Sequence, residues 1–303
     1  MYLPAISIGY AVPTGNFDAS VHSVFQSSIN LRFSRVDRLL TVVISSEADL
    51  PQGIRLDAPK GFSFEGFQTG EPAVCRDGIL HFENSSLTIQ LHGARRWECD
   101  LPALEFDRTN PAVSAAWSFV WDALNKRQRL SEAEILAEGL LHSNESARAG
   151  VARKAGEAMS GLLNAARRYE LINISAVNSL IGLGSGLTPS GDDLLVGYLA
   201  GLWCTVRGKS ERVQFISSLG KTIIRLSRKT NDISRTYLYH AVRGQVSSLL
   251  ANLAEAICRG ENPEHLLEIA EAAMRVGHTS GMEAVTGLLA GLTAWEGNHL
   301  FSA

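Results

Sequence analysis

The chain has 303 residues, of which 45% are hydrophobic and 19% are charged, and its formal net charge is −3. This balance is typical of a globular protein and excludes wholesale disorder. It also argues against a general nucleic-acid binder, which would carry a strongly basic face. A chain of this length, enough for about two domains, buries most of its surface on folding and needs no disulfide or metal for stability.

The sequence indicates neither a signal peptide nor a metal-binding cysteine pair. The four cysteines are widely separated and form no CxxC motif, so zinc ribbons and redox motifs have no support. Residues 1–15 lack the basic segment and apolar core of a signal peptide. The most apolar stretch, residues 194–206, is too short to cross a bilayer. We therefore expect a cytoplasmic protein that binds neither membranes nor nucleic acids.

Up to about Asp107 the sequence is typical of β structure, because short runs rich in Val, Ile and Phe alternate with turn residues. Residues 39–45 have the composition of a buried strand, and residues 86–91 alternate with the period of two expected when one face is buried. The dipeptide Asp77-Gly78 indicates a tight hairpin turn, which requires positive φ angles. Several short strands at this spacing predict an antiparallel barrel or sandwich.

Beyond Asp107 the periodicity of apolar residues is helical almost to the end of the chain. Residues 131–134, with the sequence SEAE, form a capping box that predicts a helix start. Asn262 followed by Pro263 predicts another. The sequence therefore predicts an α+β protein, with a β-rich domain over residues 1–108 and an α-helical domain over residues 109–303.

Residues 182–193 read GLGSGLTPSGDD, and four glycines in this short span are too many for a helix interior, where each costs about 1 kcal/mol relative to alanine. We therefore expect residues 182–187 to form a loop, with Thr188 capping a helix that has Pro189 in its first position. Free N–H groups and the positive dipole end at such a helix start favour a bound anion. The predicted anion-binding residues of this segment are Gly184, Ser185, Gly186, Thr188, Ser190 and Gly191.

A second segment repeats this pattern 90 residues later, where the Ser-Gly pair at 190–191 is matched by the pair at 280–281. In both segments glycines spaced four apart follow, and such glycines let two helices approach closely. We infer that the two helices pack together and bring their N-terminal ends to one pocket; the alternative is that the small residues only permit tight packing. The second segment adds the candidates His278, Thr279, Ser280 and Gly281.

Asp192 and Asp193 fall in the first turn of the predicted helix, where the helix dipole alone favours a carboxylate. A carboxylate beside a bound phosphate repels it unless a cation or a hydrogen-bond donor lies between them. A functional aspartate here would therefore bind Mg²⁺ or accept hydrogen bonds from a substrate amide or ammonium group. The few, scattered histidines indicate no transition-metal site, and no cofactor other than Mg²⁺ is considered.

A third segment, residues 230–235 with the sequence TNDISR, lies between two helical stretches. Asn231 or Asp232 can cap the helix that follows. The guanidinium group of Arg235 can hold a carboxylate or a phosphate by two hydrogen bonds. Asn231 and Ser234 are also candidate anion ligands.

Sequence motifs of several common enzyme classes are missing. Gly186 and Gly191 have the spacing of a P-loop, but two aspartates follow where that motif requires Lys and then Ser or Thr. No GxSxG nucleophile elbow and no HExxH zinc helix occur. The third glycine of a dinucleotide-binding fingerprint is absent as well.

At residues 182–193, 230–234 and 277–281 the sequence resembles the AllH-like family, which has long been catalogued as of unknown function and labelled a carboxylase. Members include a subunit of oxamate carbamoyltransferase from anaerobic allantoin breakdown, a branch of purine catabolism. The resemblance spans most of the chain. It implies transfer of a carbamoyl group between oxalurate and phosphate, giving oxamate and carbamoyl phosphate. It also implies two partner subunits, one FdrA-like and one AllG-like.

For such a reaction we expect the glycine-rich turn and the turns at Ser190 and Ser280 to supply N–H donors to the developing negative charge. The candidate catalytic residues are Arg235 to grip a carboxylate or phosphate, His278 as an acid or donor, and Asp192 or Asp193 to hold the amide or Mg²⁺. Three functions stay open. The chain is a carbamoyl-transferring enzyme subunit, a carboxylase or other acyl-group enzyme, or a non-catalytic subunit that binds a metabolite and organises its partners.

Overall fold

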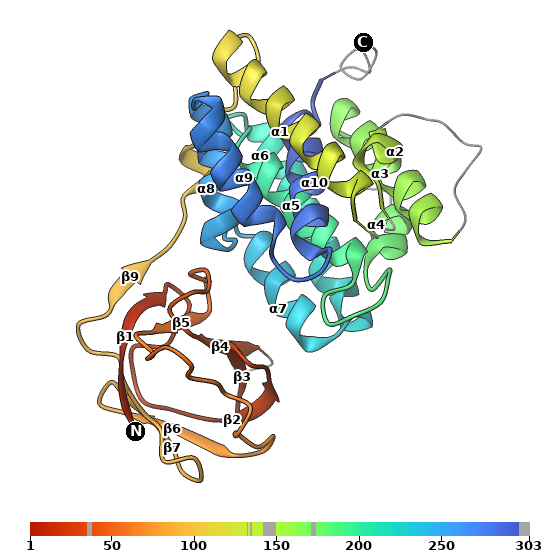
Figure 1. The fold of residues 1–303 in the computed structure, drawn as a ribbon. Helices are drawn as coiled ribbons and strands as arrows, with labels where there is room; N and C mark the ends of the chain where they lie inside the picture. Colours follow the sequence, from red (N-terminus) through yellow and green to blue (C-terminus); the bar gives the residue numbers. More distant parts are fainter. Residues whose placement is uncertain (35–37, 132, 134, 142–149, 171–173, 297–303) are drawn as a thin grey trace. The chain divides into compact units, whose positions relative to one another are not determined.

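The computed structural model describes residues 1–34, 38–131, 133, 135–141, 150–170 and 174–296. The chain divides into two compact units, Met1–Cys99 and Asp100–Ala303. Figure 1 shows strands in the first unit and helices in the second, so the predicted α+β class is confirmed. Of the predicted capping box at 131–134, Glu132 and Glu134 lie outside the described residues.

The first unit is a β barrel in which the pairing runs β1-β5-β4-β3-β2-β6-β7-β8 and returns to β1, while β9 pairs along β1 as well. Its strands are β1 (Tyr2–Gly9), β2 (Phe17–Val24), β3 (Ser28–Phe33), β4 (Leu39–Val43), β5 (Gly53–Leu56), β6 (Pro72–Arg76), β7 (Ile79–Phe82), β8 (Thr88–Gln90) and β9 (Arg95–Trp97). Of the two architectures expected from the sequence, the structure therefore has the barrel.

The barrel is mixed rather than wholly antiparallel, because β1–β8 and β4–β5 are parallel pairs. The strand β1 pairs with two strands on the same side, with residues 2–4 beside β8 and residues 7–9 beside β9. The alternation of apolar residues indicates which face of a strand is buried, but it carries no information on the direction of the neighbouring strand. The antiparallel pairing expected from the sequence was therefore right for most of the ring and wrong for these two pairs.

The interior of the barrel is built from side chains on alternate strand positions, as the period of two predicts. Phe64, Phe67 and Phe82 pack edge to face at centroid distances of 5.3–5.5 Å and fill one part of this core. The hairpin between β6 and β7 turns at Asp77 and Gly78, whose φ angles are 48° and 69°. The hairpin predicted at this dipeptide is confirmed.

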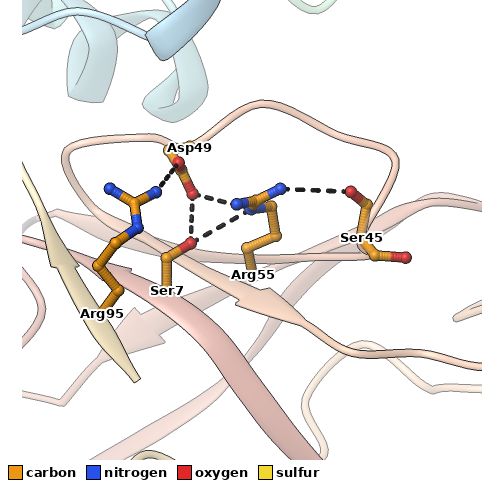
Figure 2. Close-up of polar contacts among 5 residues, drawn as sticks. All are labelled: Ser7, Ser45, Asp49, Arg55 and Arg95. Carbon is orange, nitrogen blue, oxygen red and sulfur yellow. Dashed lines mark hydrogen bonds and ion pairs between the residues drawn. The ribbon is translucent and has the colours of Figure 1, made fainter. Parts of the chain in front are cut away.

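One buried carboxylate ties a loop of the barrel to its strands (Figure 2). Asp49 is 8% exposed, and its two oxygens accept hydrogen bonds from Arg55 and Arg95, each at 2.8 Å. The Ser7 hydroxyl donates to the same carboxylate. Two guanidinium groups and a hydroxyl compensate the loss of water around this charge, which a buried carboxylate requires.

The second unit is helical. Its helices are α1 (Pro111–Arg129), α2 (Ala137–Leu141), α3 (Val151–Arg168), α4 (Ile174–Leu180), α5 (Ser190–Trp203), α6 (Ser210–Leu226), α7 (Asp232–Ala241), α8 (Ser248–Arg259), α9 (Pro263–Met274) and α10 (Ser280–Leu292). The predicted start at Asn262 is confirmed, because its side chain accepts a hydrogen bond from the N–H of His265 and Pro263 takes the first position. Within the described ranges no helix is long and apolar enough to cross a membrane.

Helices α5 and α10 lie side by side at the centre of the helical unit (Figure 1). Nearly every residue of both helices is buried, and the acidic residues of their first turns are among the buried ones. A helix that is apolar on all sides is expected in a core rather than at a surface. The other helices therefore cover this central pair, and the two helix starts carry the residues singled out in the sequence.

Candidate functional site

The central helices pack so closely that their glycines have no room for a side chain. A Cβ atom at Gly197 would overlap the carbonyl oxygen of Ala284, and a Cβ at Gly287 would overlap that of Leu194. Gly201, one turn after Gly197 on α5, approaches Leu288, which is one turn after Ala284 on α10. The two helices are therefore parallel, and their N-terminal ends lie at the same end of the pair.

The contacts of the two helices are equivalent under the 90-residue shift seen in the sequence. Gly197 faces Ala284 and Leu288, whereas Gly287 faces Leu194 and Tyr198, which are the counterparts of those two residues. Such reciprocity describes a local twofold axis that runs between the helices, parallel to both. The predicted packing of the two repeated helices is confirmed, while their sharing of one ligand pocket stays a prediction.

At the N-terminal end of this pair the two preceding turns are in direct contact. The hydroxyl groups of Thr188 and Ser280 are hydrogen bonded at 2.7 Å. Thr188 was expected to cap α5, and this expectation is wrong. The cap position belongs to Pro189, which has extended ψ (141°), and no side chain caps the helix. The Thr188 hydroxyl is instead used to bridge to α10.

The glycine-rich segment before α5 forms a loop, as predicted, with φ angles of 72°, 105° and 95° at Gly182, Gly184 and Gly186. These angles are accessible to glycine and strained for other residues. The backbone N–H groups of Gly184, Ser185 and Gly186 donate to no acceptor in the part of the chain that the structure describes. Ser185 and Gly186 are exposed, and Gly184 is partly so. The loop thus keeps a set of unused donors.

Two predicted anion donors are engaged within the protein. The N–H of Gly191 donates to the carbonyl oxygen of Leu183, and the N–H of Gly281 donates to that of Val276, both at 2.9 Å. The reason is geometric, because each loop folds back to close the first turn of its helix. The N–H groups of these two glycines are therefore already used within the protein, and their role as anion ligands stays a prediction. Ser190 is buried, while Ser280 and Thr279 are partly exposed.

Asp192 is a connecting residue. Its side chain is 1% exposed, and it accepts hydrogen bonds from the N–H of Gly182, at 2.9 Å, and from the hydroxyl of Thr230. Burial raises the pKa of Asp192, and the hydrogen bonds from Thr230 and Gly182 oppose this shift. Both oxygens are used to tie the glycine-rich loop and the segment before α7 to the start of α5.

Asp193 has a different environment, although it follows Asp192 directly. It is 9% exposed, and its Oδ2 atom has no hydrogen-bond partner among the residues described. Burial raises the pKa of Asp193 well above its usual range, and the hydroxyls of Ser280 and Thr188 counteract this shift. The negative charges of Glu283 and Asp192 raise the pKa further. One oxygen of this carboxyl group is therefore buried without a hydrogen-bond partner among the described residues.

Glu283 on α10 is the residue that the sequence reasoning missed. It is 1% exposed and lies 90 positions after Asp193, so the local twofold axis relates the two acids. Its negative charge contributes to the raised pKa of Asp193. The signal that could have revealed it was the repeat itself, because the alignment that pairs Ser190 with Ser280 also pairs these two acids.

The predicted residues of the third segment lie at the cap and in the first turn of α7. Asn231 caps α7, accepting from the N–H groups of Ile233 and Ser234 at 3.0 Å. Arg235 forms an ion pair with Asp232 at 2.6 Å on its own helix, and Ser234 is buried close enough to Asp192 to lower its pKa. Thr230, which was not proposed as a site residue, makes the direct contact with Asp192.

The remaining predicted catalytic residue, His278, precedes α10 by two positions. His278 lies exposed on the turn between α9 and α10 and forms no hydrogen bond with any residue in the described part of the chain. No group of three or more His, Cys, Asp or Glu side chains in that part could hold a metal ion. With both oxygens of Asp192 engaged, Asp193 is the predicted aspartate whose carboxyl group has an oxygen without a hydrogen-bond partner among the described residues.

Comparison with known proteins gives a consistent result for both units. A family model described as oxamate carbamoyltransferase subunit AllH matches residues 180–292, and a model described as the AllH family N-terminal domain matches residues 4–96. The first match includes the glycine-rich loop, the segment before α7 and both central helices, and the second spans the barrel. No solved structure matches the chain. The chain belongs to the AllH family, whose name is that of a subunit of oxamate carbamoyltransferase.

Proposed function

We propose that this chain is the subunit of an oxamate carbamoyltransferase in which the carbamoyl group passes between oxalurate and phosphate. In one direction the products are oxamate and carbamoyl phosphate. The observation that carries the proposal is the meeting of two helix starts, joined by the hydrogen bond between Thr188 and Ser280, next to a loop with unused N–H donors. The family to which the chain belongs supports the same reaction.

The chemistry of this reaction suits such a site. Oxalurate, oxamate, phosphate and carbamoyl phosphate are all anions, and the carbamoyl oxygen gains negative charge as the phosphate attacks. Preorganised N–H donors stabilise such charge, and the loss of one donor typically costs about 3 kcal/mol of activation free energy. We assign this role to the N–H groups of Gly184, Ser185 and Gly186. Their glycine neighbours let the backbone approach a ligand closely.

The proposal includes partner subunits. We expect an FdrA-like protein and an AllG-like protein to assemble with this chain, because a subunit of a carbamoyltransferase needs other subunits to complete the enzyme. The anionic small molecules would bind at the helix starts described above.

The test is reconstitution from purified components. The chain is assayed alone and with both partner subunits for phosphate-dependent conversion of oxalurate, with oxamate and carbamoyl phosphate measured separately. We expect equimolar products that require phosphate. Conversion by the partners alone at the full rate would reduce this chain to a non-catalytic role. Carboxylation or another acyl transfer without any carbamoyl phosphate would overturn the proposal.

A further inference from the structure

The two aspartates at the start of α5 differ in their hydrogen bonds. Both oxygens of Asp192 accept hydrogen bonds, from the N–H of Gly182 and the hydroxyl of Thr230. Asp193 is 9% exposed, and its Oδ2 atom is buried without a hydrogen-bond partner among the described residues. A buried polar atom without a partner costs free energy. A ligand that donates a hydrogen bond to Oδ2 would recover that cost.

Ser190, the first residue of α5, carries hydrogen-bond donors that the protein does not use. It is 8% exposed, and neither its backbone N–H nor its hydroxyl group forms a hydrogen bond within the described ranges. Gly184 lies against both groups, because a Cβ atom added at Gly184 would be 3.0 Å from the N atom and 3.0 Å from the Oγ atom of Ser190. The unused N–H groups of residues 184–186 and the donors of Ser190 are therefore neighbours.

Ser190 and Asp193 are three positions apart in the first turn of α5, so their side chains lie on the same face of the helix. Helical side chains also lean toward the N-terminal end of their helix, which directs the carboxyl group of Asp193 toward Ser190. Asp192 points about 100° away from this direction and is tied to Thr230. The start of α5 thus presents hydrogen-bond donors and one unpartnered acceptor side by side.

A primary amide is the chemical group that matches this arrangement, because its oxygen accepts hydrogen bonds while its nitrogen donates them. A phosphate or a carboxylate offers no N–H to Asp193 and brings negative charge toward it. A metal cation is disfavoured by the positive end of the helix dipole. In the proposed reaction a carbamoyl group with a terminal NH2 is present in both oxalurate and carbamoyl phosphate, and it is the group that is transferred.

We propose that Asp193 recognises this carbamoyl group, with Oδ2 accepting a hydrogen bond from its NH2 group while Ser190 and the glycine-rich loop donate to its carbonyl oxygen. This inference rests on the proposed function and names the chemical group that the site selects. Transfer breaks neither N–H bond of the NH2 group, so Asp193 holds the same group in the substrate and in the product. It therefore determines specificity and positions the carbonyl carbon for attack.

Two ligands that differ in one group test this recognition. Oxalurate ends in a carbamoyl NH2 group, and N-acetyloxamate has a methyl group in its place with the rest of the molecule unchanged. Their dissociation constants are measured by titration calorimetry on the complex of this chain with its partner subunits, without phosphate, so that no transfer occurs. We expect the wild-type complex to bind oxalurate about 10- to 100-fold more tightly, the usual contribution of a hydrogen bond to a charged group.

The variant Asp193→Leu places two methyl groups where the carboxyl oxygens lie, and we expect it to bind the two ligands about equally. Asp193→Asn keeps one acceptor oxygen and should retain part of the preference. Asp122→Leu makes the same substitution at an exposed position of α1 and is the matched control, with the preference of the wild type. Thermal unfolding shows whether each variant is folded, and the comparison of the two ligands in the wild-type complex tests the proposal without any variant.

Turnover in the reverse direction gives a second measure. Oxamate is offered carbamoyl phosphate or acetyl phosphate, and both transfers release phosphate. We expect kcat/KM in the wild-type complex to favour carbamoyl phosphate by about 10⁴-fold, as in sites that reject a substrate lacking a hydrogen-bonding group. Asp193→Leu should lower kcat/KM for carbamoyl phosphate much more than for acetyl phosphate, whereas a purely structural defect would lower both alike.

The outcomes separate this inference from the function on which it rests. A wild-type complex that does not convert oxalurate and phosphate would overturn the proposed function, while a preference for oxalurate that is lost in Asp193→Leu would still support recognition of the NH2 group. An active complex that binds oxalurate and N-acetyloxamate equally would overturn only the recognition. An Asp193→Leu variant that keeps the full preference would overturn it as well.

Discussion

The hydroxyl groups of Thr188 and Ser280, 92 residues apart in the sequence, are hydrogen bonded at 2.7 Å. This contact joins the turns that precede α5 and α10 and places both helix starts at one end of the central pair. The close contacts at the glycines of the two helices fix the position of one helix along the axis of the other. The candidate site is therefore a product of helix packing, and its geometry depends on residues in the middle of the two helices as much as on the loop.

The first prediction concerns that packing. Gly197→Ala places a methyl group on the carbonyl oxygen of Ala284, so the helices must separate. We expect a loss of about 1–3 kcal/mol in the free energy of unfolding, the usual cost of overpacking, measured by urea denaturation. Gly161→Ala, in α3, is the matched control because its nearest neighbour is at ordinary contact distance. Alanine is the better helix former by about 1 kcal/mol, so this control should be neutral or stabilising; equal losses in both variants would contradict the close packing.

The second prediction concerns Asp192 and Thr230, which are hydrogen bonded across 38 residues. Thr230→Val and Asp192→Asn should each lower the free energy of unfolding by about 1–3 kcal/mol, because each leaves a buried polar group without its partner. The double variant should lose less than the sum, with a coupling energy of about 0.5–3 kcal/mol. A double-mutant cycle from urea unfolding curves measures this quantity. Strict additivity would mean that the contact does not join the two segments.

The third prediction concerns the pH dependence of stability at Asp193. Burial and the charge of Glu283 raise the pKa of Asp193 in the folded chain, so between the ordinary aspartate pKa and this raised value the folded state holds a proton that the unfolded state has released. Stability from this group is present in acid and is lost as the pH rises through that interval. Asp193→Asn removes the titration, and we expect it to unfold at a higher temperature than the wild type at neutral pH.

The difference should shrink as the pH falls toward the ordinary aspartate value, with a change in melting temperature of about 2–4 °C for each kcal/mol. Thermal unfolding followed by the helical circular dichroism signal, over a pH series, measures it. A wild-type chain that becomes more stable than Asp193→Asn as the pH rises would contradict the raised pKa. Glu255→Gln provides the comparison for a partly exposed acid.

The fourth prediction concerns the loop donors. Gly186→Ala and Gly208→Ala are a matched pair, because both glycines have positive φ, 95° and 67°, and both have open space around an added Cβ. Each should lower stability by about 1–2 kcal/mol through backbone strain. Only Gly186→Ala, which shifts the N–H groups of the glycine-rich loop, should also lower turnover of the assembled enzyme, by about tenfold or more. Equal turnover in the two variants would show that the glycine-rich loop does not take part in the reaction.

The fifth prediction concerns the barrel. Asp49→Asn removes the charge that lies between Arg55 and Arg95, and we expect a loss of about 1–3 kcal/mol in the free energy of unfolding of the barrel. This is below the usual figure for a broken buried ion pair because Arg95 is more than half exposed. Asp18→Asn, which breaks the exposed ion pair with Arg76, should cost less than about 1 kcal/mol. Comparable losses would show that the Asp49 cluster is not buried in solution.

Much of the fold could be predicted from local sequence, because local physics decides it. The Asp77-Gly78 turn needs positive φ at two positions, and few dipeptides supply it. The glycines at 182, 184 and 186 indicate a loop for the same reason. The repeat of Ser-Gly and of spaced glycines predicted the contact of α5 with α10, because only residues without side chains allow backbones to come this close.

The chemical roles of the individual residues depend on tertiary structure. Arg235, proposed to hold a carboxylate or phosphate of a ligand, forms an ion pair with Asp232 one turn away. The N–H of Gly191 donates to the loop that precedes it. Sequence position cannot distinguish Asp192 from Asp193, since both are aspartates in the same first turn. Their surroundings differ because adjacent helix residues face different directions, one toward Thr230 and the other toward α10.

The amino-acid sequence by itself determined the α+β class, the turn at Asp77-Gly78, the glycine-rich loop and the existence of a repeated helix pair. Only the tertiary structure decided the parallel strand pairs of the barrel, the separate roles of Asp192 and Asp193, and the place of Glu283. The physical reason is the separation along the chain of the residues that decide each property. Backbone conformation and apolar periodicity are properties of neighbouring residues, whereas hydrogen-bond partners and the charge on a buried acid are set by groups that folding brings from distant parts of the chain.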